Sequence, residues 1–113
     1  MSDCIFCKIA NGEIPSKKVY DDDMVCAFYD ISPQAKIHIL LIPKIHITNC
    51  DGVTEQNSIY LQRIFEAIPK IATEHKIEDN YRVISNCGKG AGQSVMHLHF
   101  HMLSDAKLSE KLV

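Results

Sequence analysis

The sequence has no apolar run long enough to span a bilayer, so we expect neither a membrane-spanning segment nor a membrane partner. It also lacks a basic stretch followed by an apolar stretch after Met1, which argues against a secretory signal. An excess of charge of one sign is missing too. The formal net charge of −2 argues against nucleic-acid binding over a broad surface, but it is compatible with one mononucleotide in a local site.

The sequence has no internal repeat, linker or low-complexity segment. We therefore expect one domain spanning residues 1–113. Periodicity and turn residues predict the α+β class with a mainly antiparallel sheet. A short helical turn over 3–12 would be capped by Asp3, and a long helix would begin after Thr54 and be kinked by Pro69. The expected strands cover residues 18–20, 24–29, 36–43, 80–86 and 94–103.

The five cysteines are odd in number and show no disulfide-framework spacing. We therefore expect free thiols and a cytoplasmic location. Cys4 and Cys7 form a Cys-x-x-Cys pair, which offers two soft ligands to a metal ion, and a tetrahedral zinc needs two more. A redox dithiol is less expected, because no thioredoxin-like unit is evident. Two unlinked thiols remain the alternative.

Three of the six histidines alternate with apolar residues in the last expected strand. A period of two puts His97, His99 and His101 on one face and leaves the other face apolar. Buried imidazoles need a partner for each ring nitrogen, so this row indicates a functional site. Two chemistries stay open. A neutral imidazole can attack phosphorus while its neighbours bind phosphate oxygens, and alternate histidines can also ligate a metal ion.

A glycine-rich loop leads directly into the histidine strand. Gly88, Gly90 and Gly92 allow backbone geometries that expose consecutive N–H groups to an anion. Because the loop precedes a strand rather than a helix, it is not a dinucleotide-binding fingerprint. A plain hairpin turn is the simpler alternative, but the histidines that follow favour an anion site.

Several motifs together resemble the histidine triad (HIT) superfamily. His97–Leu103 matches its signature, in which three histidines alternate with apolar residues. The order and spacing of the remaining motifs are similar to the Hint branch, the purine nucleoside phosphoramidases. These motifs are Cys4–Ile9, Ile14–Pro15, Asp30–Ala35, His38–Lys44 with His46, and Gly92–Val95.

The resemblance implies a HIT fold: a five-stranded, mainly antiparallel sheet with one long and one short helix, continued across a homodimer. It implies hydrolysis of purine nucleoside 5′-phosphoramidates, of the adenosine 5′-monophosphoramidase type, with AMP or GMP as product. His99 would be the nucleophile and carry a transient nucleotidyl group. His101 and His38 would bind phosphate oxygens, His97 would order the nucleophile through the backbone, and Ser94 would lie near the leaving group.

The resemblance also implies where the nucleotide binds. Gln93 and the backbone of Gly92 and Ser94 would hold the phosphate, together with the histidines, and Asp30 would bind the ribose hydroxyls. Asn86 would lie near an apolar slot for the base. That slot would be formed by Phe6, Ile9, Phe28 and Ile31.

Zinc-bearing members of the superfamily combine a Cys-x-x-Cys pair with two histidines. The matching positions here are Cys4, Cys7, His46 and His97. The resemblance therefore implies a structural Zn²⁺ and no organic cofactor.

The sequence departs from the Hint pattern in two places. Ser104-Asp105 stands where Hint proteins often have two glycines, and no tryptophan-containing extension of the animal type follows, so the leaving group is the least constrained feature. Two other functions are carried as alternatives: a nucleotide-binding regulatory module that acts through protein partners, and a dinucleoside polyphosphate hydrolase. His101 stands where transferases often carry glutamine, which weighs against nucleotidyl transfer.

Overall fold

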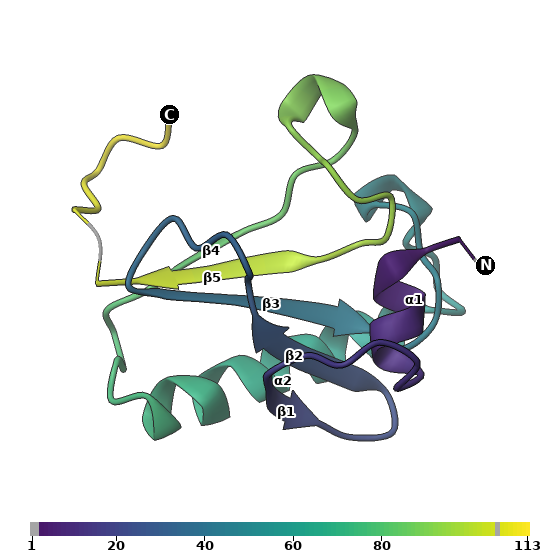
Figure 1. Ribbon diagram of the computed structural model, residues 1–113. Coiled ribbons are helices and arrows are strands. Elements are labelled where there is room, and N and C mark those ends of the chain that lie inside the picture. The colour runs from purple at the N-terminus through teal and green to yellow at the C-terminus, as the bar shows by residue number, and fades with distance from the viewer. Residues whose placement is uncertain (1–2, 106) are drawn as a thin grey trace.

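Five antiparallel strands form one sheet in the order β1-β2-β3-β5-β4 (Figure 1). The computed structural model describes residues 3–105 and 107–113; Met1 and Ser2, part of the stretch searched for a signal, lie outside the described residues. The α+β class and the five-stranded antiparallel sheet are confirmed. The strands are β1 (Lys18–Asp21), β2 (Val25–Tyr29), β3 (Ile37–Pro43), β4 (Arg82–Ile84) and β5 (Phe100–Ser104).

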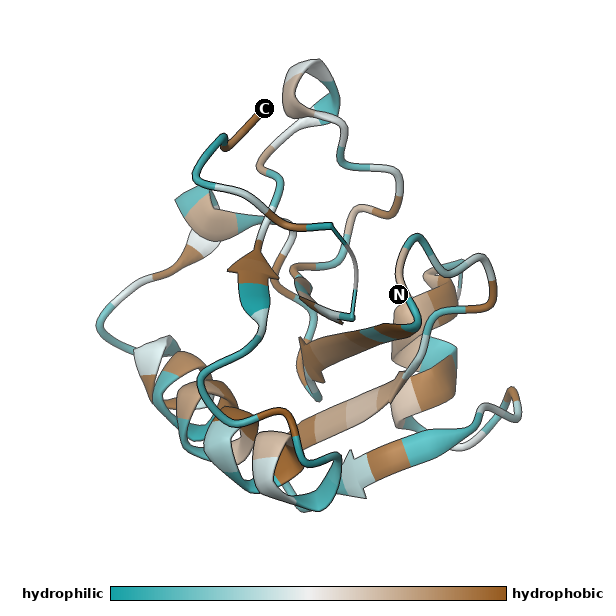
Figure 2. Ribbon diagram, turned by 90° about the vertical axis from the view of Figure 1, so that its left-hand side faces the viewer, coloured by the Kyte–Doolittle hydropathy of each residue, from teal (hydrophilic) through white to brown (hydrophobic). Residues whose placement is uncertain are grey.

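Two helices, α1 (Ile5–Ala10) and α2 (Ser58–Glu74), cover opposite faces of the sheet (Figures 1 and 2). Strand residues alternate between the two layers, as the pleat requires. Ala27 and Leu41 belong to the large core under α2, whereas Phe28 belongs to the smaller core under α1. In the described part of the chain, no helix is long and apolar enough to cross a membrane.

Both helices begin at residues other than those the sequence predicts. The sulfur of Cys4, not the carboxylate of Asp3, caps α1 and accepts the backbone N–H of Cys7 at 3.4 Å. Helix α2 begins at Ser58, because Thr54 is part of a preceding turn in which its own N–H donates to Asn57 Oδ1 at 2.7 Å. The helix then continues through the exposed Pro69 to Glu74.

The histidine strand is shorter than the sequence predicts. It begins at Phe100 rather than at residue 94, because the chain before that point leaves the ladder: the N–H of Leu98 donates to the carbonyl of Ile47 instead of to β3. The ladder to β3 ends at the pair Leu41 and Phe100, and the ladder to β4 ends at Ile84 and His101. The prediction that the apolar residues of this segment share one face, opposite the histidines, nevertheless holds. The large core contains Leu98, Phe100 and Met102.

Candidate functional site

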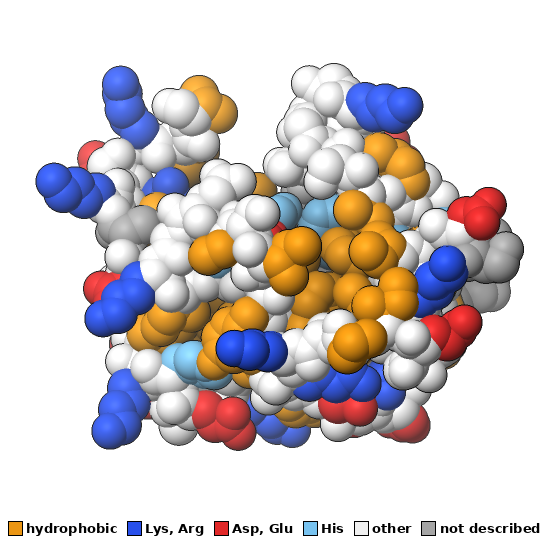
Figure 3. Space-filling view, in the orientation of Figure 1, with side chains coloured by type: hydrophobic (Ala, Val, Ile, Leu, Met, Phe, Trp, Pro, Cys, Tyr) orange, Lys and Arg blue, Asp and Glu red, His pale blue; other side chains and the backbone are white. Residues whose placement is uncertain are grey.

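A cavity of about 1230 Å³ opens on the α1 face of the sheet, with histidines at its floor (Figure 3). Its walls come from α1, the segment after it, the end of β2, the loop after β2 and the residues before and within β5. Its volume is ample for a ligand of nucleotide size. Ten of the residues predicted to bind nucleotide line it: Phe6, Ile9, Phe28, Asp30, Ile31, Asn86, Gly92, Ser94, His99 and His101.

One hydrogen bond defines the tautomer of the neutral His99 imidazole. Its Nδ1 lies 2.7 Å from the carbonyl oxygen of His97, and a carbonyl can only accept, so Nδ1 carries the proton. In the neutral imidazole, the second ring nitrogen, Nε2, is then unprotonated. The ring is only 4% exposed and meets the edge of Phe6 at 5.1 Å between centroids. His99 therefore offers a lone pair at the cavity from a fixed ring.

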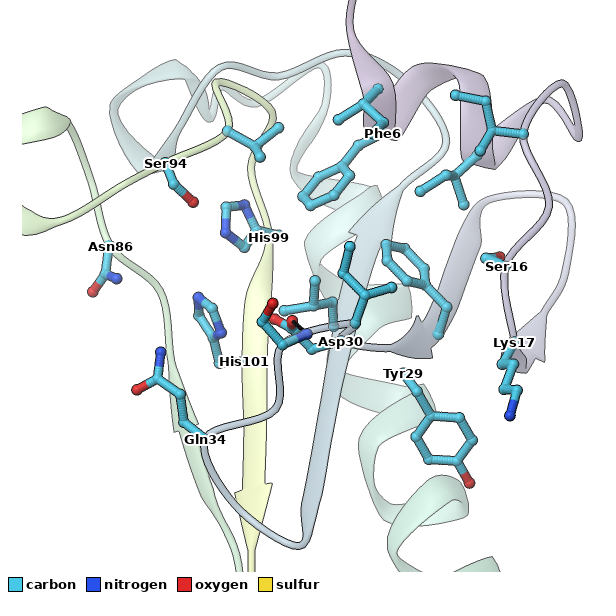
Figure 4. Close-up of a pocket in the computed structure, with 18 of the residues that line it drawn as sticks. Phe6, Ser16, Lys17, Tyr29, Asp30, Gln34, Asn86, Ser94, His99 and His101 are labelled. Atoms are coloured by element: carbon cyan, nitrogen blue, oxygen red, sulfur yellow. Dashed lines mark hydrogen bonds between the residues drawn. The ribbon is translucent and has the colours of Figure 1, made fainter.

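A chain of hydrogen bonds also defines the proton positions of His38 and His101. The backbone N–H of Gln34 donates to His38 Nδ1 at 3.0 Å, which leaves the proton of His38 on Nε2. His38 Nε2–H donates to His101 Nδ1 at 2.8 Å. The proton of neutral His101 is then on Nε2. His101 is consequently a donor beside the His99 acceptor, with 5.0 Å between the ring centroids (Figure 4).

Burial favours the neutral form of both histidines of this pair. It lowers the pKa of His101 to about 4, with further lowering from the positive charge that His99 and His38 can acquire. Burial also lowers the pKa of His38, although the carboxylate of Asp30 acts in the opposite direction. Asp30 Oδ2 lies 3.5 Å from His38 Nε2, and its other oxygen accepts the N–H of Ser32 at 2.7 Å. The carboxylate is thereby fixed at the cavity wall.

His38 does not lie where a phosphate-binding residue should lie. Its ring is 3% exposed and does not line the cavity, because it packs behind His101 and directs Nε2 at that ring. The prediction that His38 binds phosphate oxygens directly is therefore corrected. The geometry makes it a positioning residue that acts through His101.

Gln93 is also turned away from the cavity. Its carboxamide is buried, with Oε1 accepting the N–H of Gly88 at 2.8 Å and Nε2 donating to the carbonyls of Thr48 and Val95 at 2.7 and 2.9 Å. All of its strong hydrogen-bonding groups are thus engaged within the protein. The prediction that this side chain holds phosphate is corrected: Gln93 ties the glycine-rich loop to the body of the domain.

The glycine-rich loop uses most of its N–H groups internally. A short 3₁₀ turn over Lys89–Ala91 lies between Gly88 and Gly92, whose φ angles of +88° and +90° suit glycine. The N–H groups of four loop residues are bonded within this segment, namely those of Gly88, Ala91, Gly92 and Gln93. The expected cradle of consecutive glycine N–H groups is therefore absent in the described loop, and Gly92 N–H is not available to phosphate. Ser94 follows at the cavity wall.

Four residues from distant parts of the sequence meet beside α1. The ligand atoms of Cys4, Cys7, His46 and His97 all lie within 4.8 Å of one another. Cys4 Sγ is 3.3 Å from His97 Nδ1, and Cys7 Sγ is 3.4 Å from His46 Nδ1. A tetrahedral zinc ion separates its sulfur and nitrogen ligands by about 3.5 Å. The spacing of this set therefore fits the ion.

The surroundings of this cluster suit a cation as well. His97 Nε2 donates to the carbonyl oxygen of Pro43 at 3.0 Å, so Nδ1 is unprotonated and faces the two sulfurs. Burial and the adjacent Cys4 raise the pKa of the Cys7 thiol to about 11. Two thiolates would be costly at this position without a positive charge between them. The donor set is thus matched to a thiophilic cation.

The alternative of three histidine ligands on one strand is wrong for the described residues. His97 directs its ring at the cysteines, whereas His99 uses Nδ1 on a backbone carbonyl. The groups able to hold a metal ion do not include the triad as a set. One such group joins Asp30, His38 and His101, but the two facing imidazole nitrogens there already share a hydrogen bond.

The cavity has further polar lining residues that the sequence analysis missed. Gln34 lies near His101, and Ser16, Lys17 and Tyr29 lie across the cavity from it (Figure 4). Gln34 belongs to a motif already singled out, and Ser16 directly follows another. A position in or next to a motif was therefore the signal in the sequence for a cavity residue. Nothing in the local pattern shows which of these side chains reach the cavity.

Comparison with known proteins finds matches that cover nearly the whole chain. A family model described as HIT domain matches residues 11–108. The purine nucleoside phosphoramidase of Escherichia coli K12 is 46% identical over 109 residues, which cover 96% of this chain and 92% of that protein.

Two solved structures are similar over the full fold. A HIT family hydrolase from Clostridium thermocellum has a TM-score of 0.96 at 43% identity, covering 100% of this chain and 99% of that one. A histidine triad protein from Clostridium difficile has a TM-score of 0.93 at 47% identity, covering 98% and 97%. The chain therefore belongs to the HIT domain family, which includes hydrolases.

Proposed function

We propose that this protein hydrolyses purine nucleoside 5′-phosphoramidates, breaking the phosphorus–nitrogen bond and releasing AMP or GMP. The observation that carries the proposal is the tautomer of His99, whose Nδ1–H is held by the His97 carbonyl so that Nε2 keeps its lone pair. The Escherichia coli relative, named as a purine nucleoside phosphoramidase, supports the substrate class.

The reaction proceeds in two displacements at phosphorus. The amine nitrogen of the substrate takes a proton from solvent. His99 Nε2 then attacks phosphorus, the bond to the amine breaks and the neutral amine leaves, while the Nε2–H of His101 donates a hydrogen bond to a phosphate oxygen. The His97 carbonyl stabilises the positive imidazolium of the nucleotidyl-His99. Water then attacks phosphorus and loses a proton to solvent, the bond to His99 breaks with its electron pair returning to Nε2, and the nucleoside monophosphate leaves.

The same cavity offers a place for each part of the nucleotide. The phosphate lies between His99 and His101, with Ser94 beside the leaving group and Asn86 close by. The fixed carboxylate of Asp30 accepts hydrogen bonds from the ribose hydroxyls. The base enters an apolar slot in which Phe6 meets Phe28 edge to face at 5.5 Å. Ile9 and Ile31 complete the slot.

We propose a structural zinc ion held by Cys4, Cys7, His46 and His97. The matched donor distances and the unprotonated Nδ1 of His97 support this assignment. The ion would tie α1 to the segment before β5, and so fix both Phe6 and the carbonyl that orients His99. It would take no part in the displacement at phosphorus.

We propose a homodimer in which the sheet continues from one protomer to the next. Strand β4 is at one edge of the sheet and, within the described residues, pairs with β5 alone, so its outer N–H and C=O groups are available for pairing. Phe65 of α2 is 52% exposed, which is unusual for so large an apolar side chain.

The free thiols of all five cysteines support the proposed cytoplasmic location.

A kinetic comparison tests this function. Adenosine and guanosine phosphoramidates are offered alongside dinucleoside polyphosphates, and kcat/KM is measured for each. The proposal predicts the highest kcat/KM for the phosphoramidates. Preference for the polyphosphates would instead assign dinucleoside polyphosphate hydrolysis, and tight AMP binding without any hydrolysis would assign a nucleotide-binding regulatory module.

A further inference from the structure

One polar atom at the cavity wall has no assigned role. The hydroxyl oxygen of Ser16 is buried and lacks a hydrogen-bond partner among the described residues, although the residue lines the cavity. A buried hydroxyl without a partner has lost its hydrogen bonds to water and has formed none within the protein to replace them. Alanine would serve packing alone at lower cost, so the hydroxyl indicates a partner that arrives with a ligand.

The backbone fixes Ser16 beside the apolar slot. The carbonyl of Lys17 accepts the N–H of Tyr29 at 3.1 Å, and the register of β1 and β2 then pairs Lys18 with Phe28. Ser16 therefore lies one residue before the point where its segment is attached to β2. The side-chain hydroxyl is not bonded, so rotation about χ1 toward the cavity breaks no hydrogen bond.

The position of Ser16 relative to the histidines specifies which part of a ligand it meets. Figure 4 shows Ser16 on the opposite side of the cavity from His99 and His101, with Phe6 between them. A nucleotide with its phosphate at the histidines and its base beside Phe6 directs the far edge of the base at Ser16. In a purine, that edge carries the exocyclic group.

We propose that Ser16 is a specificity-determining residue that hydrogen-bonds the exocyclic group at carbon 6 of the purine. This inference rests on the proposed function, because it takes the phosphate to be at the histidines. A hydroxyl can accept from the amine of adenine and donate to the carbonyl of guanine, so one side chain serves both bases. It offers nothing to a purine that lacks this group.

Calorimetric binding measures this contact apart from catalysis. The ligands are AMP and the 5′-monophosphate of purine riboside, which lacks the exocyclic amine. We expect the native protein to bind AMP about fivefold more tightly, the effect of one neutral hydrogen bond. Ser16→Ala should reduce this ratio to about one, Ser16→Thr should retain it because the hydroxyl remains, and Ser58→Ala, at the exposed start of α2, should leave it unchanged.

The outcomes separate this inference from the proposed function. An unchanged ratio in Ser16→Ala, or no binding of AMP to the native protein, would overturn the role of Ser16. If the native protein hydrolyses adenosine phosphoramidate while the ratio stays unchanged in Ser16→Ala, only the Ser16 inference fails. If the affinity ratio falls to about one in Ser16→Ala but the native protein hydrolyses no phosphoramidate, Ser16 keeps its role in base binding and the proposed hydrolysis fails.

Discussion

The Nε2 atom of His38 lies 2.8 Å from the Nδ1 atom of His101, and only His101 of the two lines the cavity. This relationship makes His38 a buried support for the residue that binds the phosphate during the displacement. We expect His38→Ala to lower kcat by about 10- to 100-fold, since one fixed hydrogen-bond donor to the charge of the transition state contributes about 10²- to 10³-fold. Because His38 does not touch the substrate, KM should change little. Steady-state kinetics measure both, and a raised KM with unchanged kcat would contradict the support role.

Removal of the proposed zinc should loosen the fold around α1. Cys7→Ser should reduce the bound zinc from about one ion per chain to near zero, measured by elemental analysis of protein purified without chelator. Its Tm should fall by more than about 4 °C, because a loss of even 1 kcal/mol produces such a shift in a domain of this size. Cys50→Ser is the matched control, since Cys50 is exposed and outside the cluster. Equal zinc content in the two variants would dismiss the assignment.

The neutral state of His101 predicts a pH dependence of stability. Its pKa is lowered from 6.5 to about 4 in the folded protein, so between these values the unfolded chain binds more protons than the folded one. The free energy of unfolding should therefore fall as the pH is lowered from about 6.5 toward 4. In His101→Asn the slope of unfolding free energy against pH should be smaller, by the equivalent of about one bound proton. Urea unfolding at several pH values tests it, and identical slopes would show that His101 does not titrate in this way.

The buried carboxamide of Gln93 predicts a large effect on stability. Gln93→Ala leaves the N–H of Gly88 and the carbonyls of Thr48 and Val95 without their partner. We expect a loss of about 2–4 kcal/mol of unfolding free energy, because each buried orphan group costs about 1–3 kcal/mol before water relieves part of it. In the control Gln62→Ala, an exposed residue of α2, the loss should stay below about 0.5 kcal/mol. Equal losses in both variants would contradict the role given to Gln93.

Much of the fold follows from local patterns. The alternation around His99 predicts which residues face the core and which face the cavity, because the pleat alternates whether or not neighbouring strands pair there. The extent of β5 does not follow from that pattern. It depends on where the pairing with β3 and β4 stops, which the tertiary arrangement sets: the N–H of Leu98 bonds to Ile47 although β3 continues to Pro43.

The site could be predicted as a set of residues but not as a set of roles. The predicted site residues include ten that line the cavity, and they also include His38 and Gln93, which face away from it. The orientation of those two side chains depends on buried partners far along the chain, such as His101 and Thr48. The cap of α1 by Cys4 was missed for a related reason: the sulfur is placed there by the cysteine-histidine cluster rather than by helix propensity.

The most direct test of the account is whether His99 becomes covalently modified. Native protein is mixed with excess adenosine 5′-phosphoramidate and quenched within one turnover in alkaline denaturant, which preserves a bond between phosphorus and imidazole nitrogen. Peptide mass spectrometry should then locate one nucleotidyl group on His99. His99→Ala should show neither the adduct nor turnover while still binding AMP, which serves as evidence that it is folded. Undiminished hydrolysis by His99→Ala, or an adduct on a different residue, would contradict the account.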